Sequence, residues 1–141
     1  MLLEVFGLRN FGQHYHSSEL VAMSEKFIAS NFVECSFTEE FPSLDKEAVV
    51  TLLSRNDLQV KLEEDIFTAI TIWINYHAVI RSQNIFELLK QVRLDVVKPY
   101  YLASVIATYQ ACKSSTDCQQ LIKTAALYHL NHSKCNKTDV I

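Results

Sequence analysis

Three side chains near the end of the sequence are of types that bind zinc. They follow the pattern His129-x2-His132-x2-Cys135. Zinc needs three or four ligands that converge in a tetrahedron, and the sequence has no Cys-x2-Cys pair that could complete such a site. We therefore interpret the cluster as a group of surface residues, and we predict neither a metal ion nor a cofactor.

Two groups of adjacent carboxylates are of the type that performs acid–base chemistry. They are Glu39-Glu40 and Glu63-Glu64-Asp65. Both stand where first turns of helices are expected, and the partial positive charge of a helix N-terminus favours carboxylates there without any catalytic role. No serine lies in the small-residue turn that exposes a nucleophile. The sequence thus predicts no catalytic residue and no enzymatic activity. A small helical enzyme built on the histidine and cysteine cluster is the alternative from another class.

The chain is poor in the residues that build turns. Of its 141 residues, two are glycine and two are proline, whereas average usage would give about 17 of both together. Sandwiches, barrels and propellers use these residues at every hairpin. Apolar residues make up 49% of the chain and recur mostly at helical spacing. The composition therefore argues against β folds and predicts an all-α domain.

Charge and cysteine content indicate a compartment and exclude two classes of partner. The net charge is −3, with −7 on residues 1–65 and +4 on residues 66–141. An acidic chain does not suit a phosphate backbone, so we expect no nucleic-acid partner. No window approaches the roughly 18 apolar residues of a membrane span, so we expect no membrane partner. The four cysteines have the irregular spacing of reduced thiols, which predicts a cytoplasmic or nuclear location.

The first part of the chain is predicted to form helices joined by short loops. The first helix should end near Gly12, which has no Cβ and tolerates a left-handed cap. A second helix is expected over about residues 18–32, with an N-cap at Ser17 or Ser18. A short turn over residues 38–41 should then stop at Pro42, and Ser43 should cap the next helix.

The strongest helix signal covers about residues 63–78. Its apolar stripe is wider than that of an exposed helix, so neighbouring helices should cover both flanks; the stripe consists of Ile66, Phe67, Ile70, Trp73, Ile74 and His77. Further helices are expected over residues 85–92, from Pro99 onward, and over residues 117–130. Thr116 and Gln119 form a capping box for the last of these helices.

Together these signals predict about eight helices stacked as antiparallel helical hairpins. The domain should cover residues 1–130, and residues 131–141 should form a polar, frayed tail. Arg93 should bury its stem and bond the carbonyls of a helix end. The alternative is that Arg93 faces a partner. We expect the core to contain Phe27, Phe32, Leu58, Phe67, Trp73, Leu94 and Leu102.

The beginning of the chain is unusually apolar for the first turns of an isolated domain. Its large apolar residues are Met1, Leu2, Leu3, Val5, Phe6 and Leu8. One flank of this helix is therefore predicted to meet something that the chain does not contain. The alternative is that the helix packs on the helix over residues 18–32.

The order of residues is similar to that of a known family along roughly residues 4–130. Four stretches show this as a set: Phe6-Gly7-Leu8-Arg9-Asn10-Phe11-Gly12, Ser54-x2-Asp57-Leu58-x-Val60-x2-Glu63, Ile66-Phe67-x-Ala69-x3-Trp73-Ile74, and Val92-Arg93-Leu94 followed by Pro99-x-Tyr101-Leu102. They resemble the BACK domain of BTB-BACK-kelch proteins. The resemblance implies an all-helical, non-catalytic linker between a BTB domain, which dimerises and holds a cullin scaffold, and a kelch propeller, which captures substrates for ubiquitination.

The resemblance also implies partners and a site. In that family the first BACK helices and the end of the BTB domain form a groove for the cullin. Carried onto this chain, the groove wall would consist of Leu2, Leu3, Val5, Phe6, Leu8 and Arg9. The expected partners are the cullin scaffold of RING ubiquitin ligases, the BTB and kelch domains of the same parent chain, and a second copy bound through the BTB domain. The alternative is the BACK domain of an actin-associated or transcriptional scaffold without a ligase role.

Overall fold

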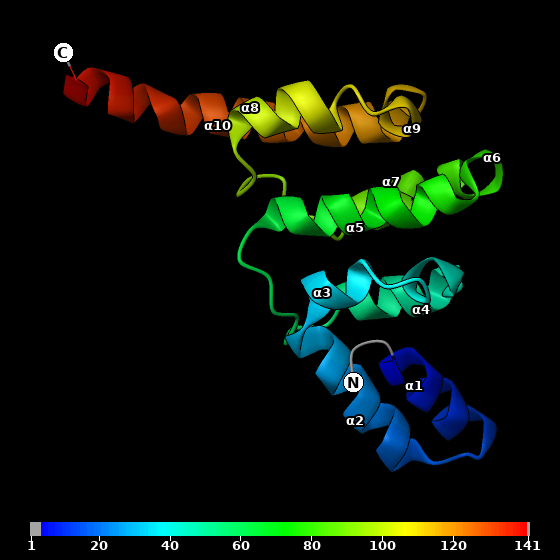
Figure 1. Cartoon of the computed structure of the whole chain (residues 1–141). Helices are drawn as coiled ribbons and strands as arrows, with labels where there is room; N and C mark the ends of the chain where they lie inside the picture. The colour runs from blue at the N-terminus through cyan, green and yellow to red at the C-terminus, as the bar shows by residue number, and fades with distance from the viewer. Residues whose placement is uncertain (1–3, 141) are drawn as a thin grey trace.

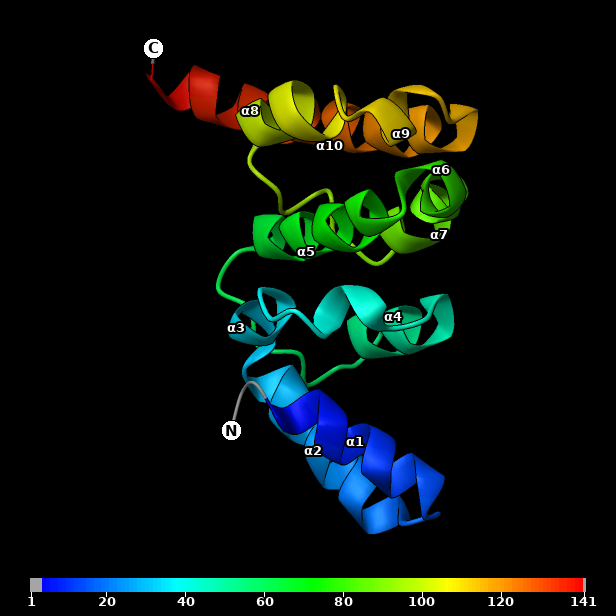
Figure 2. The same cartoon turned by 45° about the vertical axis from the view of Figure 1, so that its right-hand side comes forward.

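The chain folds as a stack of helical layers. A computed structural model describes the backbone of residues 4–140 and the side chains of residues 4–132; within these limits it contains helices and no strand, which confirms the all-α prediction. Figure 1 and Figure 2 show four layers, each made of roughly antiparallel helices. Their main members are α1 (Val5–His14) with α2 (Ser18–Ser30), α3 (Phe32–Ser36) with α4 (Lys46–Leu53), α5 (Glu63–Tyr76) with α7 (Ile85–Leu89), and α8 (Pro99–Tyr101) with α10 (Thr116–Val140).

Short helical turns connect these helices. They are η2 (Phe41–Ser43), α6 (Ala78–Arg81), η3 (Ser82–Asn84), the π-helical turn η4 (Leu102–Ile106) and α9 (Gln110–Lys113). Among the described helices, none combines the length and the apolar character needed to cross a bilayer.

Side-chain caps set where several helices begin. The Ser17 hydroxyl accepts a hydrogen bond from the Leu20 N–H at 3.3 Å, as predicted for α2. The prediction that Ser43 caps the next helix is wrong, because Ser43 lies in η2 and the Asp45 carboxylate accepts from the Ala48 N–H at 2.8 Å. An aspartate at this place also meets the positive end of the helix dipole, which a serine does not exploit.

The last helix also begins on a different cap from the one predicted. The Ser115 hydroxyl accepts from the Cys118 N–H at 3.2 Å, so the capping residue precedes Thr116 by one position. The α10 helix then continues past Leu130 to Val140, further than its apolar spacing predicted. The domain boundary at residue 130 stays a prediction.

Gly12 does not end the first helix as predicted. It lies buried inside α1, and the left-handed residue that follows the helix is His16, with φ 58°. A Cβ on Gly12 would lie 3.1 Å from Val21 Cγ2 and 3.2 Å from Leu20 Cβ. The missing side chain of Gly12 therefore serves the close approach of α1 to α2.

The turn around Pro42 and the end of α5 also differ from the predictions. Pro42 lies within η2, near its beginning, rather than after a turn that it stops. Its fixed φ suits the first positions of a helical turn. His77 is exposed at the C-cap of α5 and does not belong to the buried stripe, because the helix ends at Tyr76.

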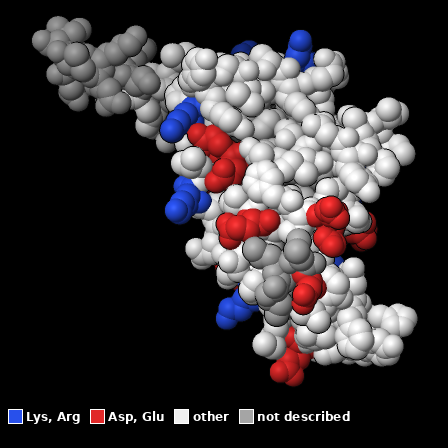
Figure 3. All heavy atoms as spheres, viewed as in Figure 1, with Lys and Arg blue, Asp and Glu red and all other residues white. Residues whose placement is uncertain are grey.

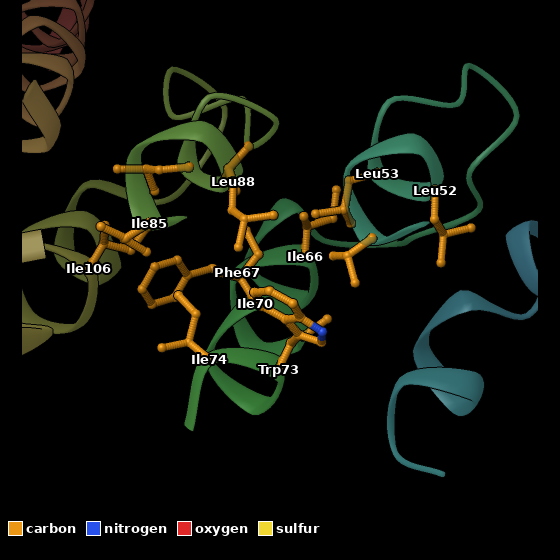
Figure 4. Close-up of a cluster of buried hydrophobic side chains, with 14 of the residues drawn as sticks. Leu52, Leu53, Ile66, Phe67, Ile70, Trp73, Ile74, Ile85, Leu88 and Ile106 are labelled. Atoms are coloured by element: carbon orange, nitrogen blue, oxygen red, sulfur yellow. The ribbon is translucent and has the colours of Figure 1, made fainter. Parts of the chain in front are cut away.

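The core is centred on α5, as Figure 4 shows. The other five residues of the predicted α5 stripe are buried. Leucines of α4 and Ile106 of η4 meet them from the two neighbouring layers, and Leu88 of α7 meets them from the same layer. Of the residues expected in the core, Phe32, Phe67, Trp73, Leu94 and Leu102 are buried, and Phe27 and Leu58 are partly buried against the same cluster. Close packing on both sides of one helix makes α5 the central element of the stack.

Arg81 and Trp73 fasten the second layer to the third. The indole N–H of Trp73 donates to the Leu44 carbonyl at 2.7 Å. The Arg81 guanidinium lies 4.0 Å from the centroid of the Trp73 ring and donates to the carbonyls of Pro42 and Trp73, at 2.7 and 2.8 Å. Burial lowers the pKa of Arg81 below its usual value. Two backbone carbonyls that end helical segments are thereby satisfied inside the protein.

The two glycines of α1 have different surroundings, and substituting each of them tests how α1 packs. We expect Gly7→Ala to raise the free energy of unfolding by about 1 kcal/mol, because nothing lies within 4 Å of the added Cβ and alanine favours the helix. Gly12→Leu should lower it by about 1–3 kcal/mol through overpacking against α2. Urea unfolding followed by circular dichroism measures both changes. An equal response of the two positions would contradict the close approach at Gly12.

Trp73 should be among the residues that stability depends on most. Replacing it with alanine leaves a cavity between α5 and the second layer and removes the bond to Leu44, so we expect Trp73→Ala to cost about 3–5 kcal/mol. The same unfolding measurement tests this. A loss below about 1 kcal/mol would show that the tryptophan does not hold the layers together.

Candidate interaction surface

The residues predicted to form a partner-facing wall on the first helix divide into three groups. Leu2 and Leu3 lie outside the described residues. Val5 and Phe6 are buried in the chain's own core, which corrects the expectation that their side chains face a partner. The Phe6 ring lies 6.4 Å from that of Phe41. The alternative, that the first helix packs on the helix over residues 18–32, is confirmed, because α1 packs along α2. Phe6 in addition contacts the second layer at Phe41.

The outer face of α1 carries an exposed apolar stripe. It consists of Leu8, Phe11 and Tyr15, which are 36%, 55% and 64% exposed. These positions are spaced three and four apart, so they follow one another along one side of the helix. The rings of Phe11 and Tyr15 contact each other, with centroids 4.6 Å apart. We call these three residues the α1 stripe.

Two features fix the α1 stripe in place. The close approach at Gly12 presses α1 onto α2, and the Arg9 guanidinium binds the Glu25 carboxylate of α2 at 3.0 Å. Arg9, also predicted as part of the wall, thus uses its charge within the chain. The stripe therefore lies on a helix whose rotation about its own axis is set by its contacts with α2.

The surface near the first layers is acidic. Figure 3 shows carboxylates gathered on one face from the level of α2 up to that of α5. A cavity of about 530 Å³ opens between α1, α2 and α4, and Glu25, Glu40, Asp45 and Glu47 are among the residues that line it. The Arg55 guanidinium, which bonds Asp57 through two nitrogens, holds the pKa of that carboxyl below its usual value. Partners with basic groups would be attracted to this side of the molecule.

The zinc-type residues at the end of the chain do not converge on one point in the part that the structure describes. The Nε2 atom of His129 lies 3.1 Å from the Leu94 carbonyl, and Nδ1 of His132 lies 2.8 Å from the Tyr128 carbonyl. Each imidazole is thus engaged with a different backbone oxygen. Cys135 lies outside the residues whose side chains are described. Among the described side chains, no group of three or more potential ligands could hold a metal ion.

The carboxylates at the start of α5 have a structural task. Glu63 is buried, and its Oε1 accepts from the Arg93 backbone N–H at 2.9 Å. The Arg93 side chain is 73% exposed and reaches Glu63 Oε2 at 3.4 Å. The prediction that Arg93 bonds helix-end carbonyls is therefore wrong, and Arg81 does so instead. Glu63 thus bonds the turn after α7.

The three cysteines whose side chains are described are buried and poorly suited to act as nucleophiles. Cys35, Cys112 and Cys118 are free and inaccessible. Burial raises the pKa of Cys35 to about 11 and that of Cys112 to about 12, and it raises the pKa of Cys118 as well. The thiolate is the reactive form of cysteine, so these side chains contribute apolar volume rather than reactivity.

The stacked hairpins define the class of the protein as an all-α domain built from helical layers. A comparison with protein families identifies which one: the model of the BACK family, described as BTB And C-terminal Kelch, matches residues 5–107. The match covers well over half of the chain, and the chain belongs to the BACK family. BACK domains are non-catalytic, adaptor-type linker domains of BTB-kelch proteins.

The raised thiol pKa of Cys112 predicts a dependence of stability on pH. Because its pKa is higher in the folded than in the unfolded chain, the thiol stabilises the fold below about pH 9, and this contribution falls as the pH rises toward 12. Between pH 9 and 11 we expect the free energy of unfolding to fall by on the order of 1 kcal/mol per pH unit more in the wild type than in Cys112→Ala. Urea unfolding over this range measures the two slopes. Equal slopes would contradict a buried, neutral thiol.

Proposed function

We propose that the chain is the linker domain of a BTB-BACK-kelch substrate receptor in a cullin-RING ubiquitin ligase. In this role it has no catalytic activity. It holds the substrate-binding kelch domain at a set distance from the cullin, and its first hairpin contributes to the surface that receives the cullin. The parent protein dimerises through its BTB domain and acts in the cytoplasm or nucleus, without a nucleic-acid or membrane partner. The observation that carries the proposal is the family match over residues 5–107.

The α1 stripe supports a role of the first hairpin in binding. Large apolar side chains on one exposed helix face cost solubility unless another surface covers them. Leu8, Phe11 and Tyr15 form such a face, and the bonding of Arg9 to Glu25 keeps it turned away from the second layer. Aromatic side chains are frequent in the centres of protein interfaces. The stripe is therefore the part of α1 that we assign to the cullin, in place of the buried Val5 and Phe6.

The layered architecture supports a role as a spacer. The layers share one cluster of buried apolar side chains, and the Arg81 side chain joins the second and third layers by bonding backbone carbonyls. A stack joined in this way separates whatever binds its two ends by a fixed length. Such a length is what an adaptor needs in order to present a substrate to an enzyme held elsewhere.

Charged substitutions on the α1 stripe test the proposal. In the full-length parent, we expect Leu8→Asp/Phe11→Asp to weaken cullin binding at least tenfold, because two apolar contacts would be replaced by charges that must lose water. Co-precipitation and calorimetry with the cullin measure the affinity. Val79→Asp is the control, since Val79 is 98% exposed on α6 in the third layer, away from the first hairpin.

The controls decide how the result is interpreted. The helical circular-dichroism signal should be the same in both variants, because the substituted side chains are exposed. Unchanged cullin binding by Leu8→Asp/Phe11→Asp would refute the assignment of the stripe. A parent protein that binds no cullin at all would instead favour an actin-associated or transcriptional scaffold.

A further inference from the structure

The joint between the first hairpin and the rest of the stack differs from the joints between the other layers. Figure 1 and Figure 2 show α1 and α2 inclined to the direction that α4, α5 and α10 share. The other layers meet through the apolar core around α5. The first layer meets the second through the aromatic contact of Phe6 and the buried Ile28 of α2, and also through a chain of charged groups beside a cavity.

The aromatic contact lies at the beginning of α1. Phe6 packs on Phe41 of η2, and Phe41 packs on Phe32 of α3 with ring centroids 6.2 Å apart. All three rings are buried. The contact joins the hairpin to the second layer near one end of α1, so the rest of the helix extends beyond it.

The charged chain lies one turn further along α1. Glu25 of α2 binds two arginines: Oε2 lies 3.0 Å from Arg9 Nε, and Oε1 lies 3.9 Å from Arg55 Nη1. Arg55 belongs to the loop after α4 and also binds Asp57 at 2.8 and 2.9 Å. The side chains of Arg9 and Glu25 are only 12% and 25% exposed. One carboxylate thus joins α1, α2 and the loop that leaves the second layer.

The cavity of about 530 Å³ lies beside this chain. Among the residues that line it are Phe6, Arg9 and Glu25 on the hairpin and Leu44 and Ala48 on the second layer. Side chains that face a cavity lack the van der Waals contacts of a filled core. On the side of the joint that faces the cavity, resistance to a rotation of the hairpin about Phe6 therefore rests on the polar contacts, and Glu25 makes two of them.

We propose that Glu25 is a positioning residue that holds the first hairpin at its angle to the stack, with the Phe6–Phe41 contact as the pivot. Without the carboxylate, Arg9 and Arg55 face each other as like charges, which favours opening of the joint. Removal of the Arg55 charge alone should open the joint less than removal of the carboxylate, because the bond between Arg9 and Glu25 remains. The hinge itself requires no partner; only its consequence for the orientation of a cullin rests on the proposed function.

Distances between spin labels test the hinge. In a Cys135→Ser background, labelled cysteines at Met23 and Val79 report the distance from the hairpin to the third layer, and labels at Val79 and Leu127 report a distance that does not cross the joint. All three positions are exposed, and the other native cysteines are buried. We expect Glu25→Gln to widen the Met23 to Val79 distance distribution at least twofold and to leave the Val79 to Leu127 distribution unchanged.

Glu87→Gln is the matched control. It also removes one carboxylate from an ion pair, the 3.1 Å contact between Lys46 of α4 and Glu87 of α7, but this pair lies outside the first joint. The proposal would be overturned if the Met23 to Val79 distance distribution were the same in Glu25→Gln and wild type. It would also be overturned if this distribution widened equally in Glu87→Gln.

If Glu25→Gln does not fold, Arg55→Gln is measured in its place. We then expect a smaller widening of the Met23 to Val79 distribution, and an unchanged distribution would again refute the hinge. Because no cullin is present, the outcome is independent of the cullin-binding experiment.

Discussion

Burial of α5 on both of its sides is the constraint on which the rest of the structure depends. The side chains of Phe67, Ile70 and Trp73 in its apolar stripe are buried, so one helical layer must cover α5 from above and another from below. The polar groups near its ends then fix those layers: Glu63 bonds the turn after α7, and Arg81, in the turn beyond α5, bonds the carbonyl of Pro42. Dense packing supplies the attraction, and these few hydrogen bonds select one register between layers.

Much of the fold could be predicted from the sequence because helix period and burial leave strong local signals. The α5 stripe and the Ser17 cap are of this kind. The errors arose where two residues could perform the same local task. Ser43 and Asp45 are both good N-caps, and the dipole favours the aspartate. Gly12 suits a helix end as well as a helix crossing, and only the position of α2 decides between them.

The interaction surface was harder to predict, since exposure depends on contacts between distant segments. The apolar start of the chain led to the prediction of a partner-facing wall on the first helix, but spacing alone does not say which side of this helix meets the second layer. Phe41 decides this by covering Phe6, and the face with Phe11 and Tyr15 is left exposed. The spacing of Leu8, Phe11 and Tyr15 was visible in the sequence, and a comparison of the two faces of α1 would have found it. The joint at Glu25 had no such signal, because Arg55 lies in a loop beyond α3 and α4, and only the fold brings it to the first hairpin.

The layered stack also affects how quickly the domain folds and where it begins to unfold. Each layer contacts mainly its neighbours in the chain, so most contacts close short loops, and such topologies fold quickly. The same locality means that the end layers have one neighbour each while the α5 layer has two. Opening should therefore begin at the ends and reach α5 last. The two ends are the places where an adaptor binds other domains, so binding there protects the regions of lowest local stability.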